Sequence, residues 1–195
     1  MLHRDSGDVR RSEAEARVTR FGDRSKLYTG RGPNGRRLCG ICGTEVPPGR
    51  RAWCSESCVH EWNLRSSGSY MRHHVKQRDA GICAICGLDC PKLDRILRRA
   101  SESLRTMPLV CPDGAHRYAF RFHVRQEMYR SLGFVPDRAF WEVDHVVPVV
   151  RGGGSCGLDN LRTLCVPCHR NETRALAAER ARERKDESRL LLEGE

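Results

Sequence analysis

The chain has 195 residues, enough for one medium domain or two small ones. Hydrophobic residues make up 38% and charged residues 31%, and no apolar run approaches the roughly 20 residues of a bilayer-spanning helix, which argues against a membrane-spanning protein. The formal charge is +10, from 31 Arg and 4 Lys against 25 Asp and Glu, so a polyanion is the favoured partner.

Eleven cysteines are unusual in so polar a chain. The first residues, MLHRDSGDVRRSE, contain no apolar segment of the kind that a secretory signal peptide requires. We therefore expect a protein that is not secreted and that resides in the cytoplasm, at the nucleoid or, in a eukaryote, in the nucleus. Because such compartments keep thiols reduced, the cysteines are interpreted as metal ligands and not as disulfides.

Residues 1–38 are the first expected segment. They hold ten Arg and Lys against five Asp and Glu, with almost no periodic apolar pattern. This composition predicts a disordered basic arm, which either contacts phosphates or serves as a passive leader.

Residues 39–80 contain four cysteines in two close pairs, Cys39-x2-Cys42 and Cys54-x3-Cys58. Two short turns with this spacing can surround one tetrahedral ion, and a segment of about 40 residues with few apolar side chains needs such an ion to fold. The sequence therefore predicts a four-cysteine zinc module. One or two helices are expected over 55–79, with a break at 66–69.

Residues 81–187 are expected to form a second domain, followed by a tail at 188–195. Apolar side chains recur at helical spacing after Pro91, and the Ala, Arg and Glu content of 172–192 also favours a helix. Residues 117–132 fit a helix or a strand, and the helix is preferred. Residues 140–150 are rich in Val and aromatic side chains and predict a strand, followed by a glycine turn.

The second domain holds two more cysteine pairs, separated by a long stretch of chain. We expect these pairs to share a second structural zinc ion, with the last pair at the start of the final helix: Cys83, Cys86, Cys165 and Cys168. Three cysteines remain, Cys90, Cys111 and Cys156. Cys90 and Cys111, with His116, form either a further site or free buried thiols.

The last cysteine pair closes the segment WEVDHVVPVVRGGGSCGLDNLRTLCVPCHRNET. In order, it places an acidic residue beside a histidine on a strand, a glycine turn, Asp-Asn before a second strand, and Cys and His at a helix start. This order resembles the HNH endonuclease motif, with His145, Asn160 and His169 at its three named positions. The resemblance implies an α+β fold of the ββα-metal, treble-clef type, in which two antiparallel strands and a helix clasp one divalent ion.

A more extended likeness runs from about residue 39 to 184. FWEVDH, LDNLRTLC, RRAWCSESC and NLRSSGSY resemble the nuclease domain of the annealing-helicase family that bears a Ran-binding-type zinc finger, while 89–138 match least. The likeness implies DNA as substrate, branched or fork-like in shape. Because the chain has no GxxxxGK[ST] loop, ATP-driven remodelling is expected from a helicase or translocase in trans.

The resemblance also implies a role for each site residue. His145 is the general base, a task that suits a neutral imidazole near pH 7. Asp144 and His169 hold one Mg²⁺ or Mn²⁺, and Asn160 ties the glycine loop to the strand, although in some relatives this position binds metal. Neighbouring strand residues point to opposite faces, so Asp144 and His145 cannot both bind one ion unless the backbone bends.

The expected function is metal-dependent hydrolysis of DNA phosphodiester bonds that leaves 5'-phosphate and 3'-hydroxyl ends. A restriction or mobile-element HNH nuclease is the alternative within the same class. From a different class, the alternative is a catalytically inactive, zinc-dependent DNA-binding protein. A departure from the motif, Thr173 in place of a second helix histidine, favours Asp144 as the metal ligand.

Overall fold

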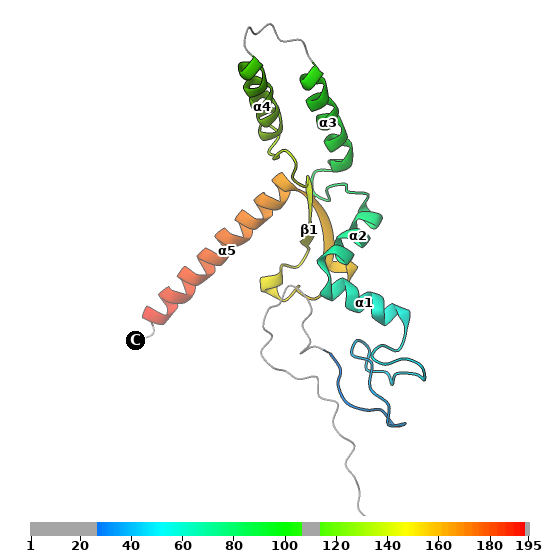
Figure 1. Cartoon of the computed structure of the whole chain (residues 1–195). Coiled ribbons are helices and arrows are strands. Elements are labelled where there is room, and N and C mark those ends of the chain that lie inside the picture. Colours follow the sequence, from blue (N-terminus) through cyan, green and yellow to red (C-terminus); the bar gives the residue numbers. More distant parts are fainter. Residues whose placement is uncertain (1–26, 107–113, 194–195) are drawn as a thin grey trace, which may run out of the picture. The chain divides into compact units, whose positions relative to one another are not determined.

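The computed structural model describes the backbone of residues 27–106 and 114–193. It describes the side chains of residues 27–104 and 119–191. Five α-helices, two strands and two 3-10 turns follow one another along this part of the chain (Figure 1). In order they are α1 (Glu56–Ser66), α2 (Gly68–Asp79), α3 (Cys90–Thr106), α4 (Gly114–Arg130), β1 (Trp141–His145), η2 (Val149–Arg151), η3 (Leu158–Asn160), β2 (Leu161–Cys165) and α5 (Val166–Glu193).

The described chain divides into two compact units, each made of two chain segments. The first unit combines Met1–Arg78 with His145–Arg162, and the second combines Asp79–Asp144 with Thr163–Glu195. None of the described helices combines the length and the apolar character that a membrane-spanning segment needs.

Helices α1 and α2 of the first unit follow their capping residues. The side chain of Ser55 accepts a hydrogen bond from the backbone N–H of Cys58, which satisfies one of the unpaired donors at the start of α1. The backbone is extended at Ser67, whose hydroxyl accepts from the N–H of Tyr70 and so starts α2. The predicted pair of helices and the break between them are therefore confirmed.

Residues 27–38 differ from the disordered arm that their composition predicts. The carboxylate of Glu45 accepts hydrogen bonds from the backbone of Arg36 and from both the backbone and the side chain of Asn34. Bridges pair Arg31 with Arg37 and Leu38 with Glu45. The side chain of Glu45 thus holds this basic stretch by hydrogen bonds. The mean composition of residues 1–38 does not reveal these contacts. Residues 1–26 of the expected arm lie outside the described residues.

The core of the second unit is aromatic. The rings of Phe134 and Phe140 are stacked at 4.5 Å, and Tyr129 meets Phe140 edge-on at 5.7 Å. All three are nearly inaccessible to solvent, and Cys83, Cys90, Leu97, Leu164 and Cys165 pack in the same cluster. This cluster joins the ends of α3 and α4 to the strands and to the second cysteine set. The predicted helices over 91–104 and 117–132 are confirmed, as α3 and α4.

Strands β1 and β2 form a two-stranded sheet. Val146 N donates to Asn160 O, and Val166 N donates to Phe140 O, so the pairing runs antiparallel. The strand predicted over 140–150 is too long, because β1 ends at His145. Pro148 has no N–H to donate, and its carbonyl accepts from Arg151 and Gly153, which turns the chain into η2.

Candidate active site and cysteine clusters

The first unit gathers the four cysteines of the first set around one point. Their sulfur atoms all lie within 4.8 Å of one another, and three of the separations are 3.4, 3.5 and 3.7 Å, between Cys42 and Cys54, Cys54 and Cys58, and Cys58 and Cys42. Four sulfurs at about 2.3 Å from a tetrahedral zinc ion lie about 3.8 Å apart. The cluster therefore has the dimensions of a zinc site.

Ionisation of the first set also suits a cation. A hydrogen bond with the hydroxyl of Thr44 lowers the pKa of Cys42 to about 6, so this sulfur is largely thiolate at neutral pH. Burial, together with the neighbouring sulfurs, raises the pKa of Cys58 to about 12. Four thiolates at this spacing repel one another, and a divalent cation removes that cost.

The second unit gathers the second set in the same way. The sulfurs of Cys83, Cys86, Cys165 and Cys168 lie within 4.8 Å of one another, with 3.7 Å between Cys86 and Cys165. Burial opposes ionisation of Cys83, but backbone N–H groups of Cys165, Cys86 and Ile85 outweigh it and lower the pKa of Cys83 to about 6. Cys168 lies in the first turn of α5, as predicted.

Of the remaining cysteines, Cys90 and Cys156 do not join either set. Cys90 is the first residue of α3 and is fully buried, and burial raises its pKa to about 12, so it is a protonated core thiol. Burial also raises the pKa of Cys156. Cys111 lies outside the described residues, and so does the side chain of His116. None of the ten described cysteines takes part in a disulfide.

The second unit also places Asp144 beside His169. Asp144 is the fourth residue of β1 and His169 the fourth residue of α5, and Oδ1 of Asp144 lies 3.9 Å from Nε2 of His169. Two ligands of one ion at about 2.1 Å lie between about 3.0 Å and about 4.2 Å apart, depending on whether they are adjacent or opposite. The side chains are 19% and 35% exposed, so a substrate can reach both.

The first unit contains His145 and the loop that follows it. His145 ends β1 and is 8% exposed. The amide of Asn160 pairs with both backbone groups of Val147: Oδ1 accepts from its N–H at 2.7 Å, and Nδ2 donates to its carbonyl at 3.2 Å. Nδ2 also donates to the carbonyl of Gly153 at 2.9 Å. One side chain thus replaces the strand pairing that stops at His145.

Gly153 is required by the closeness of this loop. A Cβ atom at this position would lie 1.8 Å from the carbonyl oxygen of Val147 and 2.8 Å from Nδ2 of Asn160. Gly152 precedes it with φ at +89°, but a Cβ there would meet nothing within 4 Å. In the glycine turn predicted from the sequence, Gly153 is therefore required for lack of space, and Gly152 is favoured by its positive φ.

Two residues at the end of α2 were not singled out by the sequence reasoning. The guanidinium of Arg78 donates to the carbonyls of Leu158 and Leu161, each at 2.6 Å, and so spans Asn160 from both sides. In the second unit, the carboxylate of Asp79 accepts from the N–H and the hydroxyl of Thr163 on β2, at 3.0 and 2.9 Å. Partners 80 or more residues away leave no pattern in the local sequence.

Comparison with known proteins agrees with the motif. Residues 132–175 match the family model described as HNH endonuclease, a range that contains all four predicted site residues and the last cysteine pair. The chain contains a domain of the HNH endonuclease family. Its HNH domain is a nuclease domain, and the small α+β fold with two cysteine clusters agrees with the class that the resemblance implies.

Among relatives of this HNH chain are proteins named DNA annealing helicase and endonuclease ZRANB3. The cattle protein (Bos taurus) is 38% identical over 74% of this chain, and the mouse protein (Mus musculus) is 37% identical over 81%. The chain spans only 13% and 15% of their lengths. The crystal structure of the human ZRANB3 HNH domain is 30% identical, with 62% of this chain and 97% of that chain covered and a TM-score of 0.38.

Proposed function

We propose that the protein is a metal-dependent DNA endonuclease that hydrolyses phosphodiester bonds. The observation that carries the proposal is the pair formed by Asp144 and His169, partly exposed to solvent and spaced for one ion, inside a segment that matches the HNH endonuclease family. The net charge of +10 supports a polyanionic substrate.

Asp144 and His169 fit a hard divalent ion such as Mg²⁺ or Mn²⁺. A carboxylate oxygen and an imidazole nitrogen are ligands that such ions accept, and two protein ligands leave positions for water and phosphate oxygens. When bound, the ion supplies charge stabilisation at the phosphate and at the departing 3'-oxygen.

His145 is proposed as the general base. Its imidazole takes a proton from the attacking water, the new P–O bond forms, and the bond from phosphorus to the 3'-oxygen breaks. The products are a 5'-phosphate and, after the departing oxygen takes up a proton, a 3'-hydroxyl. His145 directly follows Asp144 in β1, and alternation along a strand gives the two side chains opposite directions, which suits separate roles.

Asn160 is proposed as a positioning residue and not as a metal ligand. Its amide makes three hydrogen bonds, to Val147 and Gly153, with the backbone of the loop that begins just after His145. An amide whose oxygen already accepts from Val147 at 2.7 Å is poorly placed to bind an ion as well. These hydrogen bonds hold the backbone that follows His145, and in this way Asn160 would help to orient the His145 side chain.

Each cysteine set is proposed to hold one structural zinc ion. The support is the same in both units: four sulfurs within 4.8 Å and one thiol in each set with a pKa near 6. Nothing in the thiolate chemistry of these clusters serves the hydrolysis. The zinc ions act on cleavage through the fold alone.

Branched or fork-like DNA is proposed as the preferred substrate. The ZRANB3 relatives are named both as an annealing helicase and as an endonuclease, and this chain corresponds to a small part of their length. A helicase or translocase partner in trans would open or remodel such junctions. DNA shape, more than base sequence, is then expected to govern the choice of cleavage site.

Nicking assays on supercoiled, linear and forked DNA test the proposal. With Mg²⁺ or Mn²⁺, the wild type is expected to nick and His145→Ala is expected to lose nicking while still binding the same DNA. If the wild type binds forked and supercoiled DNA but leaves both intact across these metals, the protein is the inactive zinc-dependent binding module. If it cuts linear DNA as fast as forked DNA, the restriction or mobile-element alternative is the better description.

A further inference from the structure

Helices α3 and α4 enclose a pocket in the second unit, whose lining lies outside residues 132–175 except for Asp137. The two helices lie side by side (Figure 1). The pocket between them has a volume of about 460 Å³, within the range of about 300–1,000 Å³ of small-molecule sites. It is lined by Arg98, Ser101, Glu102, Leu104, Arg121, Phe122, Arg125, Tyr129 and Asp137.

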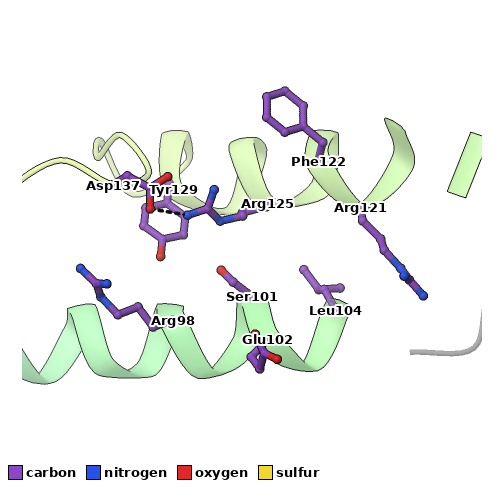
Figure 2. Close-up of a pocket in the computed structure, with 9 residues that line it drawn as sticks. All are labelled: Arg98, Ser101, Glu102, Leu104, Arg121, Phe122, Arg125, Tyr129 and Asp137. Carbon is purple, nitrogen blue, oxygen red and sulfur yellow. Dashed lines mark hydrogen bonds and ion pairs between the residues drawn. The ribbon is translucent and has the colours of Figure 1, made fainter. Parts of the chain in front are cut away.

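All the lining residues except Asp137 come from the two helices. Arg98 and Ser101 are one turn apart on α3, and Arg121, Arg125 and Tyr129 follow at intervals of four on α4. Figure 2 shows the guanidinium of Arg98 and the hydroxyl of Tyr129 directed into the space between the helices. Like charges four residues apart, such as Arg121 and Arg125, destabilise a helix unless an anion offsets them.

Carboxylates hold two of the arginines in place. Arg98 Nε lies 2.8 Å from Asp94, and Arg125 Nη2 lies 2.7 Å from Asp137, whose side chain is 74% exposed. Cζ of Arg125 also lies 5.6 Å from the centre of the Tyr129 ring, within the range of a cation–π contact. Exposed ion pairs are worth about 0–1 kcal/mol, so exchange of Asp137 for another anion costs little.

We propose that this pocket binds the phosphate backbone of a DNA strand away from the point of cleavage, with Arg98 and Arg125 as its main contacts. The inference rests on the proposed function, because it takes DNA as the substrate. Arginine presents a planar fork of donors that matches phosphate oxygens, and the hydroxyl of Tyr129 adds a further donor. A nuclease that acts on a fork needs such a second contact to hold one arm.

Donor geometry favours a phosphate backbone over an acidic peptide. The two carboxylates of the pocket, Glu102 and Asp137, oppose either anion, so the choice depends on how the arginines meet the oxygens. Phosphodiester oxygens accept from two arginines at once, and each neutralised phosphate also releases counterions into solution. Displacement of bound DNA by polyglutamate as readily as by unlabelled single-stranded DNA would overturn the choice.

Binding of labelled forked DNA without added Mg²⁺ or Mn²⁺ tests the inference apart from cleavage. The variant with Arg98→Gln and Arg125→Gln is expected to bind roughly thirtyfold more weakly at 0.15 M salt, and the slope of log K against log salt should fall by about two. The matched control carries Arg95→Gln and Arg99→Gln, two exposed arginines of α3 outside the pocket lining. It removes the same charge and should lose less than about threefold, with the slope kept.

Asp137→Asn gives a prediction of opposite sign. Asp137 has φ at +60°, a conformation that Asn adopts readily, so the change removes charge without backbone strain. Loss of the competing carboxylate should tighten DNA binding, by about threefold or more. If the Arg125–Asp137 pair served the fold alone, affinity would stay unchanged or fall, and the inference would be wrong.

The outcomes separate the two proposals. A protein that binds through the pocket but never nicks DNA supports the pocket and contradicts the endonuclease proposal. A protein that nicks DNA, with the pocket variant binding as tightly as its control, supports the endonuclease and overturns the pocket. Arg98→Lys with Arg125→Lys keeps both charges but not the fork of donors, so its affinity should lie between those of the wild type and the Gln variant. If the Gln variant unfolds, Asp137→Asn is the test, because it keeps both arginines and is expected to tighten binding.

Discussion

Asn160 can serve either as a tie for the loop after His145 or as a ligand of the catalytic ion, and one substitution distinguishes these roles. Asn160→Asp keeps an oxygen that can bind metal, but it replaces the two hydrogen bonds from Nδ2 with a carboxylate facing the carbonyls of Val147 and Gly153. If Asn160 acts as a tie for the loop, the variant should lose about 1–3 kcal/mol of unfolding free energy and much of its nicking rate. Urea unfolding and plasmid nicking measure both. Retained activity at equal metal concentration would show that the residue is a ligand.

Arg78 is a second residue on which the position of the loop depends. Its two nitrogens each donate to a carbonyl at 2.6 Å, on either side of Asn160. Lys offers a point charge and not a fork, so Arg78→Lys should lower kcat for nicking by roughly tenfold while the zinc content stays the same. Lys76→Ala, at an exposed position of the same helix, is the control and should be silent. A loss confined to KM would instead assign Arg78 to DNA binding.

At the scale of elements, much of the fold could be predicted from local signals. Serine caps marked the start and break of α1 and α2, apolar spacing marked α3, and paired cysteines marked both clusters. The strand β1 was predicted to end five residues too late, because Val146, Val147 and Val150 have high strand propensity but lie exposed in the loop. Strand propensity is a property of the single residue. The strand ends because the side chain of Asn160, 13 positions beyond Val147, bonds to the backbone N–H and carbonyl of Val147.

The same limit applies to the candidate site. Asp144 and His169 could be named from the motif, but not their distance, because it depends on how β1 and the start of α5 are packed by the aromatic cluster. Arg78 and Asp79 escaped prediction since an arginine followed by an aspartate at a helix end has many ordinary roles. Their partners on η3 and β2 are defined only by the folded chain.

The glycine turn yields a prediction for a whole element. Gly153→Ala would bring a Cβ atom to 1.8 Å from the carbonyl of Val147, so the loop must open, at about 1–3 kcal/mol and with a nicking rate down by about a hundredfold. Gly152→Ala meets open space and suffers only backbone strain, so it should cost about 1–2 kcal/mol and change nicking little. Thermal unfolding and initial nicking rates check both. Equal rates in the two variants would mean that the shape of this loop does not control cleavage.

At the scale of the whole molecule, each unit contains one complete cysteine set, so the metal content should follow the units. Native mass spectrometry is expected to show two zinc ions, one lost in Cys42→Ser and the other in Cys86→Ser. Zinc binding is part of the folding free energy, so a chelator strong enough to remove both ions should unfold the protein. Mild EDTA should stop nicking and leave the circular dichroism unchanged, because two protein ligands hold the catalytic ion far more weakly than four thiolates hold zinc. Disulfides, or a protein folded without zinc, would contradict this prediction.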